Sequence, residues 1–270
     1  GGAIATDNCG QVSWSNNFTS LSDNCGLTGS ATVIFTASDE CGNVKTTSAT
    51  FTIVDSNAPV FTTVPSDLTV ECDGNGNTVA LENWLNNVAA SDLCGMVTIT
   101  NNFQSMSDLC GLTGSALVTW TATDECGNSA TTSATFAIAD ATGPVFTFVP
   151  ANMTRECSGV PASGTPTAVD NCSSNVTIVY NGQVRTDGNC PNNYTLTRSW
   201  TATDDCGNST VASQVITVKD TKAPHVAVPA ANLTVECDGS GNTADLNAWL
   251  SSNGGAIATD NCGQVSWSNN

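Results

Sequence analysis

The chain has 270 residues, with 24 Asp and Glu against six Lys and Arg, and a formal net charge of −18. So acidic a surface repels the phosphates of nucleic acids and of anionic membranes, which excludes both as partners. No apolar run is long enough for membrane insertion of this segment. Only 11% of residues are charged, and the many Thr, Val, Asn, Gly and Ser favour strands and turns. The composition predicts an all-β protein.

One octapeptide recurs along the chain. It reads T-A-S-D-E-C-G-N at 36–43 and returns, nearly unchanged, at 121–128 and 201–208, spacings of 85 and 80 residues. Each copy stands between two runs of alternating apolar and polar residues, which indicates the turn of a β-hairpin. The spacing predicts tandem immunoglobulin-like β-sandwich modules of about 80–88 residues.

A longer repeat sets the module boundaries. Residues 254–270 are identical to residues 1–17, a period of 253 residues, and A-P-V-F, G-P-V-F and A-P-H-V mark three module starts. We expect the C-terminal part of a module at 1–57, complete modules at 58–142 and 143–222, and the N-terminal part of a module at 223–270. Very short connections, each followed by Pro, predict stiff joints and an extended rod. We expect the export signal to lie outside this segment.

About seven short strands are expected in each module. In residues 143–222 they begin with 145–149 and 152–157, followed by a hairpin and by two long strands around the octapeptide. Asn181-Gly182 is the predicted two-residue turn of that hairpin, with Asn101-Asn102 and Asn16-Asn17 in the same role elsewhere. Apolar residues two and four positions before the terminal Asp predict one buried face on the last strand: Phe51, Ile53, Phe136, Ile138, Ile216 and Val218.

The connection after the second strand differs between modules. Residues 78–88 and 243–252 carry Leu and Trp at helical spacing, whereas 160–166 is rich in Pro and Gly. A short helix is therefore predicted in two of the three module types. Its apolar stripe could be a platform for a sugar, but a lid on the sandwich core is the favoured interpretation. The stripes are Leu81, Trp84 and Leu85, and Leu246, Trp249 and Leu250.

Thirteen cysteines with a single His and no C-x-x-C motif predict disulfides in an oxidising compartment, not zinc or redox chemistry. Strand pairing about the three predicted hairpin turns places one pair of cysteines side by side in each module. The remaining cysteines are then predicted to tie the two sheets of a module together. The predicted disulfides join Cys9 with Cys25, Cys94 with Cys110, Cys172 with Cys190, Cys72 with Cys126, and Cys157 with Cys206. Cys41, Cys237 and Cys262 are expected to find partners in flanking copies.

The Asp of the octapeptide (Asp39, Asp124, Asp204) has two interpretations. It can accept backbone N–H groups across the turn, which is favoured, or it can bind calcium. The module junctions, which carry Asp55, Asp140 and Asp220, look similar to the calcium-binding linkers of cadherins but lack their acidic cluster. Calcium is thus the one candidate cofactor. No catalytic residue is predicted, because His225 has no repeated Ser or Cys partner.

Charge is divided unevenly between the two complete modules. Residues 58–142 hold no Lys or Arg, while 143–222 hold five. Recognition of an acidic polysaccharide by this second module is one interpretation, and drift between module types is the other. The five cations are Arg155, Arg185, Arg198, Lys219 and Lys222.

Four strings carry a family resemblance: V-P-A-N-M-T-R-E-C at 149–157, A-V-D-N-C at 168–172, C-P-N-N-Y-T-L-T-R-S-W-T-A-T-D-D-C-G-N at 190–208, and V-I-T-V-K-D-T-K-A-P at 215–224. They resemble the hyalin-repeat (HYR)-like immunoglobulin-type modules of giant surface adhesins of Bacteroidetes. The resemblance implies type IX secretion, outer-membrane attachment, surface filaments and a part in gliding motility.

The predicted function is therefore the repetitive stalk of a very large secreted adhesin, not an enzyme. Its expected partners are neighbouring modules of the same chain and an external surface or polysaccharide. Two alternatives stay open, a carbohydrate-binding repeat array and the spacer region of a secreted enzyme.

Overall fold

The computed structural model describes residues 2–269 and confirms the all-β prediction, with 41% of the chain in strands and 8% in helices. The chain forms two compact units that divide between Asp140 and Ala141. None of the described helices is long and apolar enough to cross a membrane.

The first unit contains nine strands and one helix. They are β1 (Ser13–Asn16), β2 (Gly29–Ser38), β3 (Val44–Ile53), β4 (Val60–Thr63), β5 (Leu68–Glu71), α1 (Thr78–Asn86), β6 (Ala89–Ser91), β7 (Val97–Asn101), β8 (Gly114–Asp124) and β9 (Ser129–Ala139). The second unit contains β10 (Val145–Phe148), β11 (Met153–Arg155), β12 (Thr167–Val169), β13 (Thr177–Asp187), β14 (Tyr194–Thr203), β15 (Ser209–Val218), β16 (His225–Val228), α2 (Thr243–Ser251), the 3₁₀ turn η1 (Asn253–Gly255) and β17 (Ile257–Thr259).

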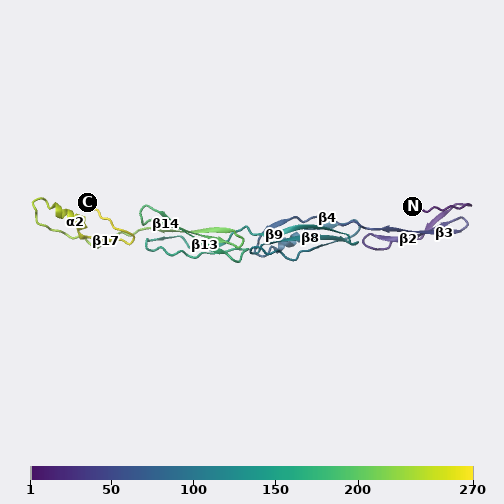
Figure 1. Cartoon of the computed structure of the whole chain (residues 1–270), viewed down its shortest axis with the longest axis horizontal. Helices are drawn as coiled ribbons and strands as arrows, with labels where there is room; N and C mark the ends of the chain where they lie inside the picture. Colours follow the sequence, from purple (N-terminus) through teal and green to yellow (C-terminus); the bar gives the residue numbers. More distant parts are fainter. Residues whose placement is uncertain (1, 270) are drawn as a thin grey trace. The chain divides into compact units, whose positions relative to one another are not determined.

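Strands β4 to β9 form a sandwich of two sheets. One sheet pairs β4 with β6, and the other has the order β5-β9-β8-β7. Strand β5 runs parallel to β9, whereas the remaining pairs are antiparallel. Figure 1 shows the two longest strands, β8 and β9, side by side. Because β4 and β5 follow each other with only 64–67 between them, the chain crosses from one sheet to the other there, and Pro65 suits a position without a ladder hydrogen bond.

Strands β10 to β15 repeat this topology in the second unit. Their sheets are β10-β12 and β11-β15-β14-β13, with β11 parallel to β15. Each sandwich thus has six strands where about seven were predicted. The chain on either side forms only part of such a structure: a three-stranded β1-β2-β3 sheet before β4, and the β16-β17 pair with α2 after β15.

All three octapeptides form hairpin turns, as predicted. They connect β2 to β3, β8 to β9 and β14 to β15, and the registers run without interruption up to each turn. Alternation on the last strand is also confirmed in both sandwiches, where Phe136, Ile138, Ile216 and Val218 are buried. In β3, by contrast, Phe51 is exposed, because no second sheet among residues 2–269 covers it.

Both predicted helices are present. Helix α1 begins after Asn77, a left-handed residue whose Nδ2 donates to Glu71 O at 2.8 Å. Its Trp84 is 5% exposed and packs against Trp120 and Phe136, with ring centroids 4.9 and 5.4 Å away. Trp84 therefore covers the core, and the lid interpretation is confirmed in this sandwich.

The predicted turn at Asn181-Gly182 is wrong. Strand β13 continues through this dipeptide and pairs with β14 along its whole length, with a bulge between Tyr180 and Gly182. Gly182 adopts a φ of 99°, so the left-handed conformation that suggested a turn serves a β-bulge instead. Asn101 and Asn16 likewise end β7 and β1 and lead into long loops, not into two-residue turns.

Candidate functional site: disulfide-bonded module junctions

The loop that connects β1 to β2 presents Cys25 at its tip. The Thr28 hydroxyl donates to Cys25 O at 2.6 Å, and Thr28 N donates to the same oxygen at 3.0 Å. Gly26 lies between them with a φ of 54°, and a Cβ at this position would meet Cys94 O at 2.1 Å. Glycine is required here because another backbone approaches it closely.

The octapeptide turn of the next module holds Cys126. The Asp124 carboxylate accepts hydrogen bonds from Cys126 N at 2.9 Å, Asn128 N at 2.8 Å and Asn128 Nδ2 at 2.9 Å. Burial tends to raise the pKa of Asp124, but the hydrogen bonds from Asn128, Cys126 and Gly127 outweigh it and hold this pKa below its ordinary value. The predicted turn role of Asp124 is confirmed, and the same network surrounds Asp39 and Asp204.

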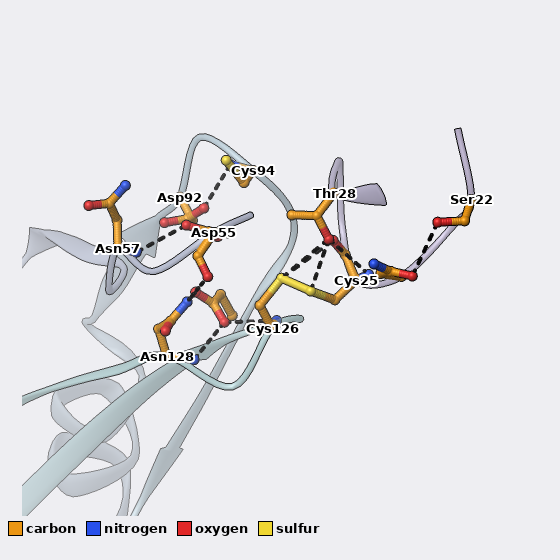
Figure 2. Close-up of a disulfide and its surroundings, with 11 residues drawn as sticks. Ser22, Cys25, Thr28, Asp55, Asn57, Asp92, Cys94, Cys126 and Asn128 are labelled. Atoms are coloured by element: carbon orange, nitrogen blue, oxygen red, sulfur yellow. Dashed lines mark hydrogen bonds between the residues drawn. A yellow bond between two sulfur atoms is a disulfide. The ribbon is translucent and has the colours of Figure 1, made fainter. Parts of the chain in front are cut away.

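Cys25 and Cys126 form a disulfide with their Cα atoms 5.1 Å apart (Figure 2). Two hydrogen bonds cross the same junction: Leu27 N donates to Cys94 O at 2.6 Å, and Asn128 Nδ2 donates to Asp55 O at 3.4 Å. The covalent bond joins the β1-β2-β3 sheet to the sandwich that begins at β4. The joint between these two modules is therefore held by one disulfide, one backbone–backbone hydrogen bond and one hydrogen bond from a side-chain amide to a backbone carbonyl.

A second disulfide, in the second unit, also joins two consecutive modules. Cys157, just after β11, is bonded to Cys262, just after β17, with a Cα separation of 5.6 Å. Glu156 beside it accepts a hydrogen bond from the Thr221 hydroxyl at 2.5 Å. This bond again connects a complete sandwich to the strands that follow it.

None of the five predicted disulfides is present. The Cys25–Cys126 bond overturns two of them, and the Cys157–Cys262 bond overturns a third. The other two fail because Cys94 and Cys190 carry free thiols. The Cys25–Cys126 bond rules out Cys9 with Cys25 and Cys72 with Cys126, and the Cys157–Cys262 bond rules out Cys157 with Cys206. The free thiols rule out Cys94 with Cys110 and Cys172 with Cys190. Cys41 and Cys237 carry free thiols, whereas Cys262, which was expected to find its partner in a flanking copy, is bonded to Cys157.

Strand length explains the error. Cys72 N donates to Ala139 O, and Gly114 pairs with Ile138, so Cys72 and Cys110 lie at one end of the β8-β9 hairpin. Cys126 lies in the turn at the opposite end. Strand β8 has 11 residues, about 33 Å at the usual rise per residue, far beyond the reach of a disulfide. The β4–β9 sandwich therefore has two cysteines at each end, Cys72 and Cys110 at one and Cys94 and Cys126 at the other.

Among residues 2–269, eight cysteines are disulfide-bonded; besides those above they are Cys72, Cys110, Cys172 and Cys206. This content is typical of an oxidising, extracellular-type compartment.

The junction also gathers acidic groups near the free Cys94. Ligand atoms of Asp55, Asp92 and Cys94 lie within 4.8 Å of one another. Burial raises the pKa of the Cys94 thiol, and the carboxylates of Asp55, Asp92 and Asp124 raise it further. A protonated thiol and two carboxylates fall short of the six to eight oxygens that calcium takes. A corresponding group in the second unit joins Glu156 and Asp220 to Cys262, whose sulfur is already in a disulfide.

Two of the five cations of residues 143–222, for which glycan recognition was one of two interpretations, make contacts within the fold. Arg198 is 4% exposed and donates to Pro161 O, Ala162 O and Gln183 Oε1. Arg185 pairs with Asp187 at 2.6 Å and lies over the Tyr194 ring, 3.7 Å from its centroid.

The sequence also contains a repeated signal for the junction loop. The string C-G-L-T-G occurs at 25–29 and again at 110–114, with the same turn hydrogen bonds in both copies. A Cβ at Gly29 would lie 1.9 Å from Ser22 O and one at Gly114 would lie 2.0 Å from Ser107 O, so neither position has room for a side chain. Five identical residues in a loop indicate a structural role as strongly as the octapeptide does.

The strand order and these disulfides define a class, tandem β-sandwich modules with covalently joined ends. Residues 149–218 match the family model described as "HYR-like domain with 4 cysteines". This match covers most of the sandwich in the second unit and agrees with the resemblance that the sequence suggested.

No curated protein matches the chain. Among solved structures, it is similar to mouse clustered PcdhgC3 EC1-3, at 13% identity and a TM-score of 0.26 over 73% of this chain and 79% of that one. It is also similar to Drosophila N-cadherin EC1-4, at 14% identity and a TM-score of 0.27 over 73% and 59% of the two chains. A third similar structure is protocadherin gammaB7 EC3-6, at 15% identity and a TM-score of 0.29 over 86% of this chain and 72% of that one. These TM-scores are low, so the fold assignment rests on the strand pairing of this chain itself.

Proposed function

We propose that this chain is a load-bearing repeat region of an extracellular adhesin, a stalk in which consecutive modules are joined end to end by disulfides. The modules are those bounded at 57/58, 142/143 and 222/223. The region is not an enzyme. Following the family resemblance, the complete protein is exported to the surface of a gliding bacterium, attached to its outer membrane, and used for surface attachment during gliding.

The observation that carries this proposal is the Cys25–Cys126 bond across a module junction. A joint that relied on a short peptide connection alone would swing and would open under tension at its weakest strand pair. A disulfide between the C-G-L-T-G loop and the following octapeptide turn gives tension a covalent path that bypasses the strands between them. A module that binds a soluble ligand has no need of such a path, whereas a stalk under tension does.

Pulling single molecules from both ends tests the proposal. The Cys25–Cys126 bond spans 101 residues of sequence, so in the oxidised chain most of that length cannot extend. The loop that this bond closes holds ~340 Å of contour length, about 3.4 Å for each of its residues. Full reduction should release more than this length, because it also opens the Cys157–Cys262 bond and the bonds of Cys72, Cys110, Cys172 and Cys206. The double variant Cys25→Ser, Cys126→Ser should release part of that total without reductant, and reduction should then release the remainder.

Equal contour lengths before and after reduction would contradict a load-bearing bond. The matched control is Cys41→Ser, which removes a free thiol from an equivalent octapeptide turn and should leave the oxidised trace unchanged. Selective binding of the oxidised chain to polysaccharides on a glycan array would favour a carbohydrate-binding array over a stalk.

A further inference from the structure

The two ends of the chain hold complementary halves of one sandwich. In the complete sandwich of the first unit, β5 pairs in parallel with β9, Leu68 opposite Phe136 and Val70 opposite Ile138. Helix α1 then covers the inner face through Trp84. Residues 223–259 contain the counterparts of β4, β5, α1 and β6, and residues 13–53 contain those of β7, β8 and β9.

The C-terminal half has the same local structure as its counterpart in the complete sandwich. Trp249 Nε1 donates to Ala231 O at 2.9 Å, as Trp84 Nε1 donates to Ser66 O at 2.7 Å. Asn242 caps α2 from the same left-handed conformation that Asn77 has before α1. Helix α2 and the segment before it therefore have the same anchoring hydrogen bond and the same N-cap conformation as α1 and its preceding segment.

This half carries an open apolar groove of about 300 Å³. Its apolar lining comes from Leu233, Val235, Leu246 and Trp249. In the complete sandwich the corresponding tryptophan is covered by the rings of Trp120 and Phe136. The counterparts of these two rings are Phe35 and Phe51, which lie in the N-terminal half.

The N-terminal half presents the surface that fits this groove. Phe51 is 63% exposed, whereas Phe136 at the same place in the complete sandwich is 0% exposed. Strand β3 is an edge of its sheet, because among residues 2–269 only β2 pairs with it. In the C-terminal half, Leu233 to Glu236 likewise pair with no described strand. An apolar edge of this kind is a template for an added strand.

We propose that residues 223–259 of one copy of this chain dock onto residues 13–57 of a second copy and complete a sandwich between them. Leu233–Glu236 add to β3 as a parallel strand, with Leu233 opposite Phe51 and Val235 opposite Ile53. Phe51 and Phe35 fill the groove beside Trp249. The contact is head to tail, so copies add in an open series. Where one protein carries the 253-residue period more than once, the same contact joins successive periods.

The free thiols fit the same contact. Cys25, in the loop of one module, bonds to the octapeptide Cys126 of the next, and Cys157, after the second strand, bonds to Cys262 of the next. By the same pattern Cys190 pairs with Cys41 of the second copy, and Cys237 pairs with its Cys94; all four are free in the single chain. Each bond forms when two thiols lose two protons and two electrons to glutathione disulfide, which becomes two glutathione thiols.

Sedimentation of the whole chain tests the contact, first with its thiols reduced and then with glutathione disulfide added. We expect concentration-dependent self-association in reductant, and on oxidation a ladder of covalent oligomers in a non-reducing gel. Peptide mapping of the ladder should find Cys41 linked to Cys190 and Cys94 linked to Cys237. A chain that stays monomeric at all concentrations, or a ladder with other linkages, overturns the proposal.

Phe51→Asp tests the register. It should weaken self-association at least about 30-fold, the effect of losing a central aromatic contact of an interface. The monomer should keep its circular dichroism, because Phe51 is already exposed. The matched control is Val44→Asp on the same strand, whose counterpart Ser129 stays exposed in the complete sandwich. Equal association of both variants, whether normal or weakened, would contradict the proposed pairing.

Discussion

The β4–β9 and β10–β15 sandwiches share one strand order, but different kinds of side chain cover their inner faces. The first uses α1, whose Trp84 packs on the rings of Trp120 and Phe136. The second has no helix. A Pro-rich connection takes its place, and Arg198, at the position of Val118 in the first, donates to the carbonyls of Pro161 and Ala162 at 2.7 and 3.0 Å.

The difference shows how the backbone hydrogen bonds of the connection determine which side chains the core contains. Proline removes the N–H groups that a helix needs, so the carbonyls of the 160–166 connection have to find donors elsewhere. A buried guanidinium supplies several donors from one side chain. A second polar replacement accompanies it, because Gln214 stands where the first sandwich has Ala134 and donates to Ala151 O at 2.8 Å. The same strand order is thus compatible with two covers of the core. One is the aromatic lid of α1, and the other is the 160–166 connection held by hydrogen bonds from Arg198, called the strap below.

Placing the buried Arg of the second sandwich at the equivalent position of the first should cause the largest loss of stability. In Val118→Arg the guanidinium enters a core that offers it aromatic rings and no connection carbonyls. We expect a loss of several kcal/mol, enough to unfold this sandwich. Hydrogen exchange resolved by peptide should show lost protection in 114–139 with 194–218 unaffected. Leu117→Arg, one residue away and 69% exposed, should be tolerated; equal damage from both would show that the buried face is not what matters.

Removing the aromatic lid should come next. Trp84→Ala deletes a buried ring and leaves a cavity against Trp120, at a cost of about 3–5 kcal/mol. Urea unfolding followed by tryptophan fluorescence measures it. Trp249→Ala makes the same chemical change on α2, where the groove is open, and should cost clearly less. A cost as large at Trp249 would mean that the helix, and not the covered core, is being destabilised.

Cutting the strap should have an intermediate effect. Arg198→Met keeps the length of the side chain but leaves two carbonyls without their donor, and we expect about 2–3 kcal/mol. The loss should appear as faster proteolysis or exchange in the 160–166 connection. Arg185→Met, at an exposed ion pair, should change the unfolding free energy little. Unchanged protection of 160–166 in Arg198→Met would contradict the role of the strap.

Lowering the pH should cause the smallest loss of stability, and this loss should be spread over several turns of the chain. Hydrogen bonds from Asn43 hold the pKa of Asp39 below its ordinary value, and hydrogen bonds from Asn75 and Asn77 do the same for Asp73. The pKa of Asp238 is lowered in the same way, mainly by the backbone of Ser240 and Asn242.

A carboxyl whose folded pKa is depressed stabilises the fold above its unfolded pKa and stops doing so as pH falls through its folded pKa. Thermal unfolding should therefore move to lower temperature as the pH drops below about 4. Asp124→Asn, at the turn with the same shift, should reduce this acid sensitivity in 58–142. An unaltered pH dependence would show that Asp124 carries none of it.

The local features of this fold were predictable because neighbours in sequence create them. The octapeptide places an Asp, a Gly with positive φ and an Asn within five residues, and their hydrogen bonds form the turn wherever the string occurs. The period of two in β9 and the helical spacing in 78–88 needed no distant partner either. The predicted turn at Asn181-Gly182 was wrong because a glycine with positive φ occurs in β-bulges as well as in turns.

The disulfides and the strap depended on tertiary structure. Sequence could count the cysteines and predict oxidation, but a disulfide forms where two thiols meet, and these thiols stand at opposite ends of strands about 33 Å long. Only the apposition of one module's loop with the next module's turn brings Cys25 to Cys126. The alternating strand pattern equally could not indicate that Arg198 points inward, because the acceptors that allow its burial lie 36 and 37 residues away. Local bonding determines the shape of each turn and strand, whereas partners distant in sequence are selected by which surfaces the assembled sheets bring together.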